Sequence, residues 1–235
     1  MSTILVTRPI DEASATAEKL EAMGHTVIIA PMISIDPVSF QIPKDDRSLI
    51  VTSKNGARHG LANIGNKARP IFAVAEETAA EARNLGFTNV AVGPGTVRQL
   101  MPMLLECGIA EKRKYAYLCG NNISYDISSA LKAEGIDSVN VTTYQSRPLR
   151  AFSAGVQEAM EEGEIDIALF YSPRTATTFE ETAAEYGRSD WLNKIDAVAL
   201  STRVKEQLIG PWKSVRYAIM PTEKSVMALI EDMTR

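Results

Sequence analysis

Short apolar runs rich in β-branched residues alternate with helical patterns along the whole sequence, and this alternation is the feature that most constrains the fold. Ile4–Thr7 indicates a buried strand, Glu12–Met23 a helix that Gly24 ends, and Thr26–Ala30 the next strand. A strand, a helix and a strand in this order form a βαβ unit, whose default geometry is a right-handed crossover between parallel strands. The sequence therefore predicts an α/β fold with parallel sheets.

The pattern continues in two further series, which proline-containing stretches separate from the first and from each other. Pro31, Pro37 and Pro43 punctuate the first stretch, and Ser146–Leu149 forms the second. Prolines remove donors from a sheet ladder, so we expect connecting segments there rather than central sheet. The further strands are too many for one small sheet and therefore predict two lobes. They are Leu49–Thr52, Ile71–Ala75, Val90–Val92, Tyr115–Leu118, Val139–Tyr144, Ile167–Tyr171, Ala197–Leu200 and Val215–Ile219.

A weak internal repeat supports the division into two lobes. The segments Ala73–Ala75 and Ala197–Ala199 match at an offset of 124 positions, and the same offset relates Leu85–Gly86 to Ile209–Gly210. The simplest account is a chain that begins one lobe, crosses to build the other, and returns to finish the first. The alternative is that α/β units resemble one another without any duplication.

Composition and charge exclude several classes of protein. The 235 residues carry 25 Lys and Arg against 29 Asp and Glu, a net charge of −4, which argues against a nucleic-acid binder but not against an anionic ligand. The N-terminus has no signal-peptide pattern, and no apolar run approaches the ~20 residues that span a bilayer. Two cysteines without a CxxC motif indicate buried thiols, and two histidines make a zinc site improbable. We therefore expect a cytoplasmic protein with no metal and no membrane contact.

Small polar residues, glycines and a few cations follow the predicted strands. Ligands of open parallel sheets bind beyond the carboxyl ends of the strands, and helix N-termini with short hydroxyl side chains there are anion receptors. For any single hydroxyl, a helix N-cap is the better interpretation. Seven such turns, with Arg8, Lys54 and Arg174 among them, favour a cleft for a ligand with several negative groups. The turns are Thr7–Pro9, Thr52–Asn55, Glu76–Thr78, Gly93–Thr96, Gly120–Asn122, Tyr171–Thr175 and Ser201–Thr202.

Motifs for cofactor chemistry do not stand out in the sequence. Gly93–Gly95 is not followed by a GxGxxG pattern, no GxxxxGK[ST] loop is present, and two histidines offer no persuasive Ser-His-Asp arrangement. An enzyme built on this sequence would work by positioning and hydrogen bonding, and we expect it to need no cofactor.

The order and spacing of these turns can be compared with those of known families. The informative pieces are Ile4–Pro9, Leu20–Gly24, Ile50–Gly56, Phe72–Ala79, Gly86–Phe87, Leu118–Gly120, Leu131–Gly135, Thr143–Tyr144 and Phe170–Ala176. In this serial order they resemble the uroporphyrinogen-III synthase family over nearly the whole chain.

The resemblance implies two parallel-sheet α/β lobes, flavodoxin-like and of the HemD type, with the second lobe inserted in the first. By resemblance, lobe 1 comprises residues 1–33 and 149–235, and lobe 2 comprises residues 38–143. Residues 34–37 and 144–148 would form a two-stranded connector. A single site between two lobes is compatible with a monomer.

The resemblance also implies the reaction. The family members are lyases of porphyrin and haem biosynthesis that need no cofactor. They close hydroxymethylbilane, a linear tetrapyrrole with eight carboxylates, into uroporphyrinogen III and invert ring D. Closure without the enzyme gives the uninverted isomer, so the protein must mainly hold a folded substrate geometry.

The resemblance and the charges together nominate the site residues. Tyr144 matches a tyrosine that the family carries after the last strand of the second lobe, and we hypothesise that its phenol assists departure of the substrate hydroxyl. The alternative role of Tyr144 is an aromatic that bridges the lobes. The expected substrate-binding residues are Arg8, Ser53, Lys54, Thr78, Ser172, Arg174, Thr175 and Ser201.

The sequence departs from the family pattern at two places, and two other functions compete with the synthase. Ala75 stands where relatives usually have glycine, and the turn Gly120–Ser124 lacks an arginine that is frequent in relatives. The first competing function is a non-catalytic two-lobed binder or sensor of an anionic small molecule. The second is a nucleotide-dependent transferase on a doubly wound sheet.

Overall fold

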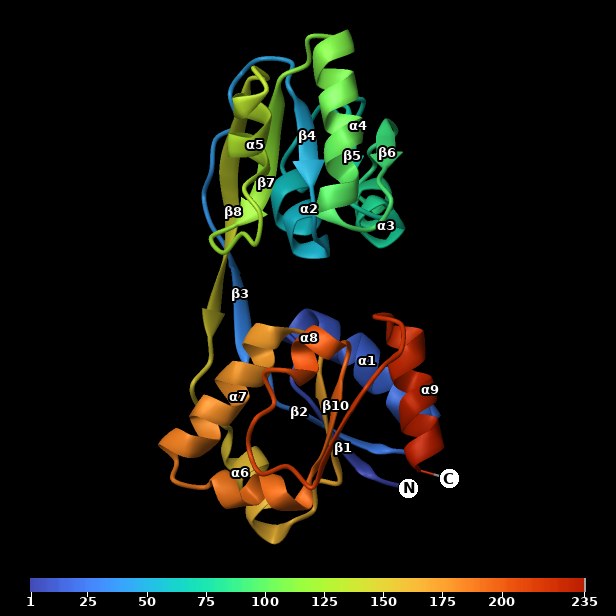
Figure 1. Cartoon of the computed structure of the whole chain (residues 1–235), viewed down its shortest axis with the longest axis vertical. Coiled ribbons are helices and arrows are strands. Elements are labelled where there is room, and N and C mark those ends of the chain that lie inside the picture. Colours follow the sequence, from blue (N-terminus) through green and yellow to red (C-terminus); the bar gives the residue numbers. More distant parts are fainter. Residues whose placement is uncertain (235) are drawn as a thin grey trace. The chain divides into compact units, whose positions relative to one another are not determined.

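The computed structural model describes residues 1–234, and the chain separates into two compact units (Figure 1). One unit comprises Met1–Ser34 and the chain from Arg147 onward, and the other comprises Ile35–Ser146. Each unit is an α/β structure with its own sheet, and the second is inserted in the sequence of the first. The predicted two-lobed α/β fold is therefore confirmed.

The first unit contains a five-stranded parallel sheet in the order β11-β10-β9-β1-β2. Strand β1 from the start of the chain pairs with β9, so Ile4 lies beside Ile167. Both faces of the sheet are covered, which explains why the strands are continuous apolar runs. The strands are β1 (Thr3–Val6), β2 (Thr26–Ile29), β9 (Ile167–Phe170), β10 (Asp196–Ala199) and β11 (Ser214–Tyr217).

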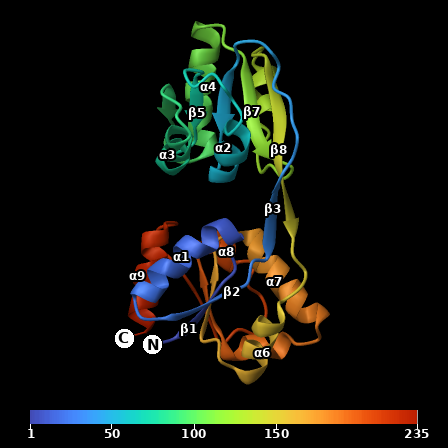
Figure 2. The ribbon, with the colours of Figure 1, turned by 180° about the vertical axis from the view of Figure 1, so that it is seen from behind.

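Helices cover the two faces of this sheet separately (Figure 2). Side chains of α1 (Ile10–Ala22) and α9 (Glu223–Met233) pack with Ile4 and Val6 in one core. Side chains of α6 (Ala154–Glu162), α7 (Pro173–Glu185) and α8 (Thr202–Lys205) pack with Leu5 and Phe170 in the other. Alternate residues of one strand therefore anchor opposite helix layers.

The second unit contains a six-stranded sheet in the order β3-β8-β7-β4-β5-β6. Its core on one face is formed with α2 and α3, and its core on the other face with α4 and α5. The strands are β3 (Ile33–Pro37), β4 (Ser48–Val51), β5 (Ile71–Ala73), β6 (Val90–Val92), β7 (Tyr115–Gly120) and β8 (Ser138–Pro148). The helices are α2 (Lys54–Leu61), α3 (Glu76–Asn84), α4 (Val97–Ala110) and α5 (Ile127–Ala133).

The structure differs from the sequence-based expectation mainly in the proline-containing stretches. Residues Ile33–Pro37 form β3 at the edge of the second sheet, and β8 continues to Pro148 through the second predicted connector. Each strand ends at its proline, where the missing N–H interrupts no ladder. The helix that follows β10 is the four-residue α8, and a 3₁₀ helix lies at Ser189–Lys194.

Two further expectations concern cysteines and membranes. Both cysteines are free thiols, as expected, but only Cys119 is buried, whereas Cys107 is half-buried. Among the residues described, no helix is both long enough and apolar enough to cross a bilayer.

Two glycines four positions apart let α2 lie unusually close to β7. A Cβ atom on Gly60 would come within 2.9 Å of the Leu118 side chain, and one on Gly56 within 2.8 Å of the Leu118 carbonyl oxygen. Residues four apart share one helix face, so both glycines face the same strand. The close contact holds the N-terminus of α2 beside the carboxyl end of β7.

We expect Gly60→Ala to lower the free energy of unfolding by about 1–3 kcal/mol, because the added methyl overpacks the contact with Leu118. The matched control is Gly155→Ala in α6, where an added Cβ meets nothing within 4 Å. Its higher helix propensity should raise stability by about 0.5–1 kcal/mol. Urea unfolding followed by circular dichroism measures both, and equal unfolding midpoints for the two variants would contradict this packing.

Candidate active site

The strand register gathers the polar turns of the second unit at the carboxyl end of its sheet. Val51 of β4 is level with Ala73 of β5 and with Leu118 of β7, and Ala73 is level with Val92 of β6. The turns that follow these strands therefore lie in one row. This is the end of a parallel sheet at which ligands bind.

Ser53 occupies the N-cap position of α2 and also contacts Tyr144. Its Oγ accepts a hydrogen bond from the backbone N–H of Gly56 at 2.9 Å and lies 3.3 Å from the Tyr144 hydroxyl. The serine is therefore a helix cap, as its position alone suggests, and also a polar neighbour of the predicted catalytic phenol.

Tyr144 is half-buried and contacts three residues, which belong to β7, to α2 and to the N-cap of α2. A Cβ atom on Gly120 would come within 2.6 Å of its ring, and the His59 ring centroid lies 5.9 Å from that of Tyr144. Ser53 supplies the third contact. We call Ser53, Gly56, His59, Gly120 and Tyr144 the Tyr144 cluster.

A second hydroxyl pair lies at the same end of the sheet. The Thr52 hydroxyl and the Tyr117 hydroxyl are 2.8 Å apart. Burial raises the pKa of Tyr117 to about 12, although the hydrogen bond with Thr52 opposes the shift. Tyr117 therefore keeps its proton at neutral pH and serves as a neutral hydrogen-bonding group.

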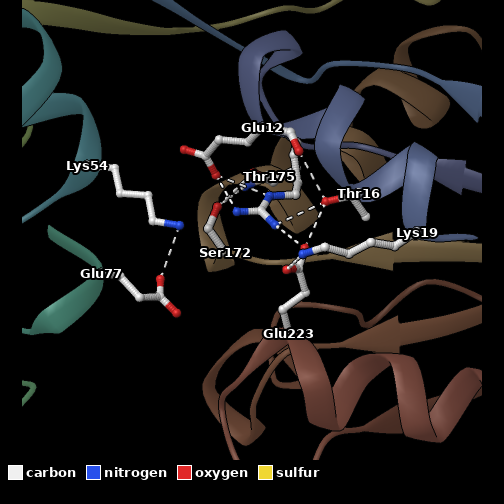
Figure 3. A network of polar contacts seen from close by, with 9 residues as sticks. Glu12, Thr16, Lys19, Lys54, Glu77, Ser172, Thr175 and Glu223 are labelled. Atoms are coloured by element: carbon white, nitrogen blue, oxygen red, sulfur yellow. Dashed lines mark hydrogen bonds and ion pairs between the residues drawn. The ribbon is translucent and has the colours of Figure 1, made fainter. Parts of the chain in front are cut away.

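Lys54 and Thr78 lie near the first turns of α2 and α3. The Lys54 Nζ is 3.2 Å from a carboxylate oxygen of Glu77, and both side chains are exposed (Figure 3). Thr78 is buried in the first turn of α3. Ala75 precedes that helix with a φ of −158°, an extended conformation open to any residue, so the alanine imposes no backbone strain.

The first unit has a comparable row of turns after β1, β9 and β10. Ser172 caps α7, and its Oγ accepts a hydrogen bond from the Thr175 N–H at 3.1 Å and lies 2.7 Å from the Thr175 hydroxyl (Figure 3). Arg174 is the second residue of the same helix. Ser201 stands at the N-cap position of α8 but forms no side-chain capping bond.

Arg8 is the centre of an ion network in the first unit. Its guanidinium pairs with Glu12 and with Glu223, the latter at 3.2 Å, and donates to the Thr16 hydroxyl. Lys19 also pairs with Glu223 (Figure 3). We call Arg8, Glu12, Thr16, Lys19 and Glu223 the Arg8 cluster. Two cations face two carboxylates, so the charge of Arg8 is compensated within the protein.

The Arg8 cluster links distant parts of the first unit. Arg8 also stacks over the Tyr171 ring with its Cζ 4.1 Å from the ring centroid, and burial raises the pKa of Tyr171 to about 12. Partial burial of Glu223 opposes its ionisation, but hydrogen bonds from Lys19 and Thr16 and the charges of Lys19 and Arg8 prevail. The pKa of Glu223 therefore lies below its ordinary value.

The structure thus brings some predicted site residues into contact within each unit. Ser53 meets Tyr144, and Ser172 meets Thr175, whereas Lys54 meets a glutamate. The sequence pattern did not single out several neighbours of these residues, although it placed Tyr117 in a predicted strand. Within the described chain, no group of three or more His, Cys, Asp or Glu residues could hold a metal ion. The neighbours that the sequence pattern did not single out are His59, Tyr117 and Glu223.

We expect Glu223→Gln to lower the free energy of unfolding by about 1–2 kcal/mol at pH 7. Because the folded-state pKa of Glu223 is lowered, its stabilisation is present above the unfolded-state pKa and is lost as the pH falls through the folded-state value. The difference from the unsubstituted protein should therefore shrink between about pH 6 and pH 3. Urea unfolding across this range measures it, with Glu158→Gln on the exposed side of α6 as control. A constant difference at every pH would contradict the ion network.

A family model and two sequence relatives all indicate the same protein family. The family model described as uroporphyrinogen-III synthase HemD matches residues 14–231. A uroporphyrinogen-III synthase from Synechococcus elongatus is 24% identical over 228 residues, which cover 91% of this chain and 84% of the relative. One from Chlorobaculum parvum is 26% identical over 218 residues, which cover 86% of this chain and 87% of the relative.

Solved structures show the same fold. The crystal structure of uroporphyrinogen-III synthetase from Helicobacter pylori matches with a TM-score of 0.66 at 19% identity, over 99% of this chain and 100% of the other. A mutant uroporphyrinogen III synthase from Thermus thermophilus matches with a TM-score of 0.59 at 18% identity, over 100% and 98%. The family model covers far more than half of the residues, and the chain belongs to the uroporphyrinogen-III synthase family.

Proposed function

We propose that the strand-end turns of both units bind the substrate of this family and that the Tyr144 phenol assists its dehydration. Membership of the family makes the chain an enzyme of the lyase class in porphyrin and haem biosynthesis, which acts on a tetrapyrrole. The family match therefore favours the synthase over a non-catalytic binder and over a nucleotide-dependent transferase.

The reaction converts hydroxymethylbilane into uroporphyrinogen III with loss of one water. Departure of the terminal hydroxyl leaves an azafulvene, and the substituted carbon of ring D attacks it to give a spiro intermediate. Fragmentation and reclosure invert ring D. No atom changes its oxidation state through an external partner, so the chemistry requires positioning and a proton for the leaving hydroxyl, and no cofactor.

The contact between Ser53 and Tyr144 is the observation that carries the proposal. The Ser53 oxygen already accepts the Gly56 N–H, so its own proton is available for the Tyr144 oxygen. The Tyr144 proton can then point to a ligand, and its half-buried position leaves the hydroxyl within reach of one. A hydrogen bond to the departing hydroxyl oxygen stabilises the negative charge that develops as its C–O bond breaks.

The helix N-termini of the strand-end turns are the proposed receptors for the substrate carboxylates. N–H groups of the first helical turn point outwards, and the helix dipole favours negative charge there. Charge from Lys54 and Arg174 adds to this field, whereas Arg8 contributes less because Glu12 and Glu223 already balance it. The hydroxyls that we assign to carboxylate binding are those of Ser53, Thr78, Ser172, Thr175 and Ser201.

The proposal extends to the cellular location, the oligomeric state and the partners of the enzyme. We propose that it works in the cytoplasm as a monomer and binds no nucleic acid. A net charge of −4 supports the last point, because nucleic-acid binding needs an excess of basic side chains.

We expect Tyr144→Phe to lower the rate of uroporphyrinogen III formation by about 10² while the unfolding midpoint stays unchanged, because only the hydroxyl is lost. Unconverted hydroxymethylbilane should then close to the uninverted isomer. Separation of the oxidised porphyrin isomers measures both products. Tyr186→Phe, a substitution of an exposed tyrosine in the first unit, is the control. A wild-type rate of type III product in Tyr144→Phe would exclude the proposed role of the phenol.

A second comparison separates substrate binding at Ser172 from its capping role. Ser172→Ala and Ser153→Ala each remove a serine that accepts a hydrogen bond at the N-terminus of a helix, so each should cost about 1 kcal/mol of stability. Only Ser172→Ala should also raise the KM for hydroxymethylbilane. Steady-state kinetics and thermal unfolding measure the two effects, and an equal KM in both variants would leave Ser172 with its capping role alone.

A further inference from the structure

The pairing of β7 with β8 changes register at the point where Tyr144 lies. Cys119 is level with Thr142, but the next residue, Gly120, is level with Tyr144, so Thr143 is an extra residue in β8. This is a β-bulge, which bends a strand and redirects the side chains that follow it. Regular pairing would set Thr143 beside Gly120 and turn Tyr144 to the other face of the sheet.

The bulge is fixed in place by buried contacts. Thr143 is fully buried, its hydroxyl donates to the Cys119 carbonyl oxygen at 3.3 Å, and its carbonyl accepts the Val38 N–H at 3.1 Å. Beyond the bulge, the Tyr144 carbonyl accepts the Asn121 N–H at 3.1 Å. The backbone on both sides of Tyr144 is therefore tied to neighbouring segments of the second unit.

Gly120 provides the surface against which the Tyr144 ring lies. A Cβ atom on Gly120 would come within 2.6 Å of Cε2 and Cζ of that ring and within 2.9 Å of its hydroxyl oxygen. Ordinary contacts begin near 3.4 Å, so any side chain at this position would push the end of the phenol outwards by most of an ångström. The φ angle of Gly120 is outside the positive range, so the backbone conformation does not require a glycine here. The glycine is required because the Tyr144 ring occupies the space of a side chain.

We infer that Gly120 and the bulge at Thr143 position the Tyr144 hydroxyl for the reaction, with Ser53 and His59 beside the phenol. This inference rests on the proposed role of Tyr144 and adds two positioning residues to it. A misplacement of about 1 Å costs as much as 10² in rate when geometry limits a reaction. Gly120→Ala, a change of one methyl group, creates a displacement of this size.

The test combines Gly120→Ala, Tyr144→Phe and the double variant, each as the full chain. We expect Gly120→Ala to lower the kcat for type III product by about 10 to 10², with KM changed less than about threefold and with more of the uninverted isomer. In the Tyr144→Phe background, Gly120→Ala should change kcat less than about threefold, because the hydroxyl it displaces is already absent. Independent, multiplying effects of the two substitutions, or a wild-type kcat in Gly120→Ala, would overturn the inference.

A spectroscopic arm keeps this result separate from the role of the phenol. The seven tyrosines are labelled as 3-fluorotyrosine, and the resonance missing from Tyr144→Phe identifies residue 144. Gly120→Ala should shift that resonance and leave the resonance of Tyr115, which lies at the other end of β7, unchanged. An unshifted resonance contradicts positioning by Gly120. A shifted resonance together with full activity of Tyr144→Phe contradicts the proposed function of Tyr144 instead.

Gly155→Ala is the control for a glycine substitution that affects no packed neighbour. An added Cβ there meets nothing within 4 Å, so kcat, isomer ratio and the resonance of residue 144 should all remain at their wild-type values. A change in any of them would show that the readouts respond to the general effect of a glycine substitution.

Discussion

The close contact between α2 and β7 is the constraint on which the candidate active site depends. Gly56 and Gly60 bring the helix against Leu118, and no residue with a Cβ would allow the same approach. The Ser53 cap at the N-terminus of this helix therefore lies within hydrogen-bonding distance of Tyr144 on β8. The contact of Gly56 and Gly60 with Leu118 is a requirement of core packing, and the contact of Ser53 with Tyr144 is a requirement of the chemistry. The short helix α2 meets both requirements.

The strand-end cations of the two units differ in how far neighbouring carboxylates neutralise them. In the first unit, Arg8 is held by two carboxylates and an aromatic ring, so it contributes to the stability of the fold more than to an anion field. In the second unit, Lys54 pairs with the exposed Glu77, and an exposed pair contributes little to stability. A polyanion can compete for such a lysine, whereas it gains less from an arginine whose charge is already balanced.

Local patterns in the sequence predicted most of the fold, because strand and helix periodicity depends on neighbouring residues alone. The alternation that begins at Ile4–Thr7 led to two α/β lobes, and the structure has them. Contacts between distant residues could not be predicted in this way. The partner of Arg8 on α9 is 215 positions away, and the bulge that turns Tyr144 depends on how two strands align. The proline pattern alone indicated a connecting segment where the edge strand β3 lies, although an edge tolerates prolines; the two-stranded connector at residues 34–37 and 144–148 came only from the family resemblance.

The pairing of β1 with β9 has a consequence for biosynthesis. Ile4 on β1 can pair with Ile167 on β9 only after residue 167 has been synthesised. Every strand of the second sheet lies between Ile33 and Pro148, so these strands can pair earlier. At about 5–20 residues per second, the ribosome needs about 10–30 s to supply the missing neighbour of β1. During that interval the apolar residues of the nascent β1, α1 and β2 have no completed sheet to cover them. The inserted order of the chain therefore leaves its earliest segment without its β9 neighbour until the whole second unit has been synthesised.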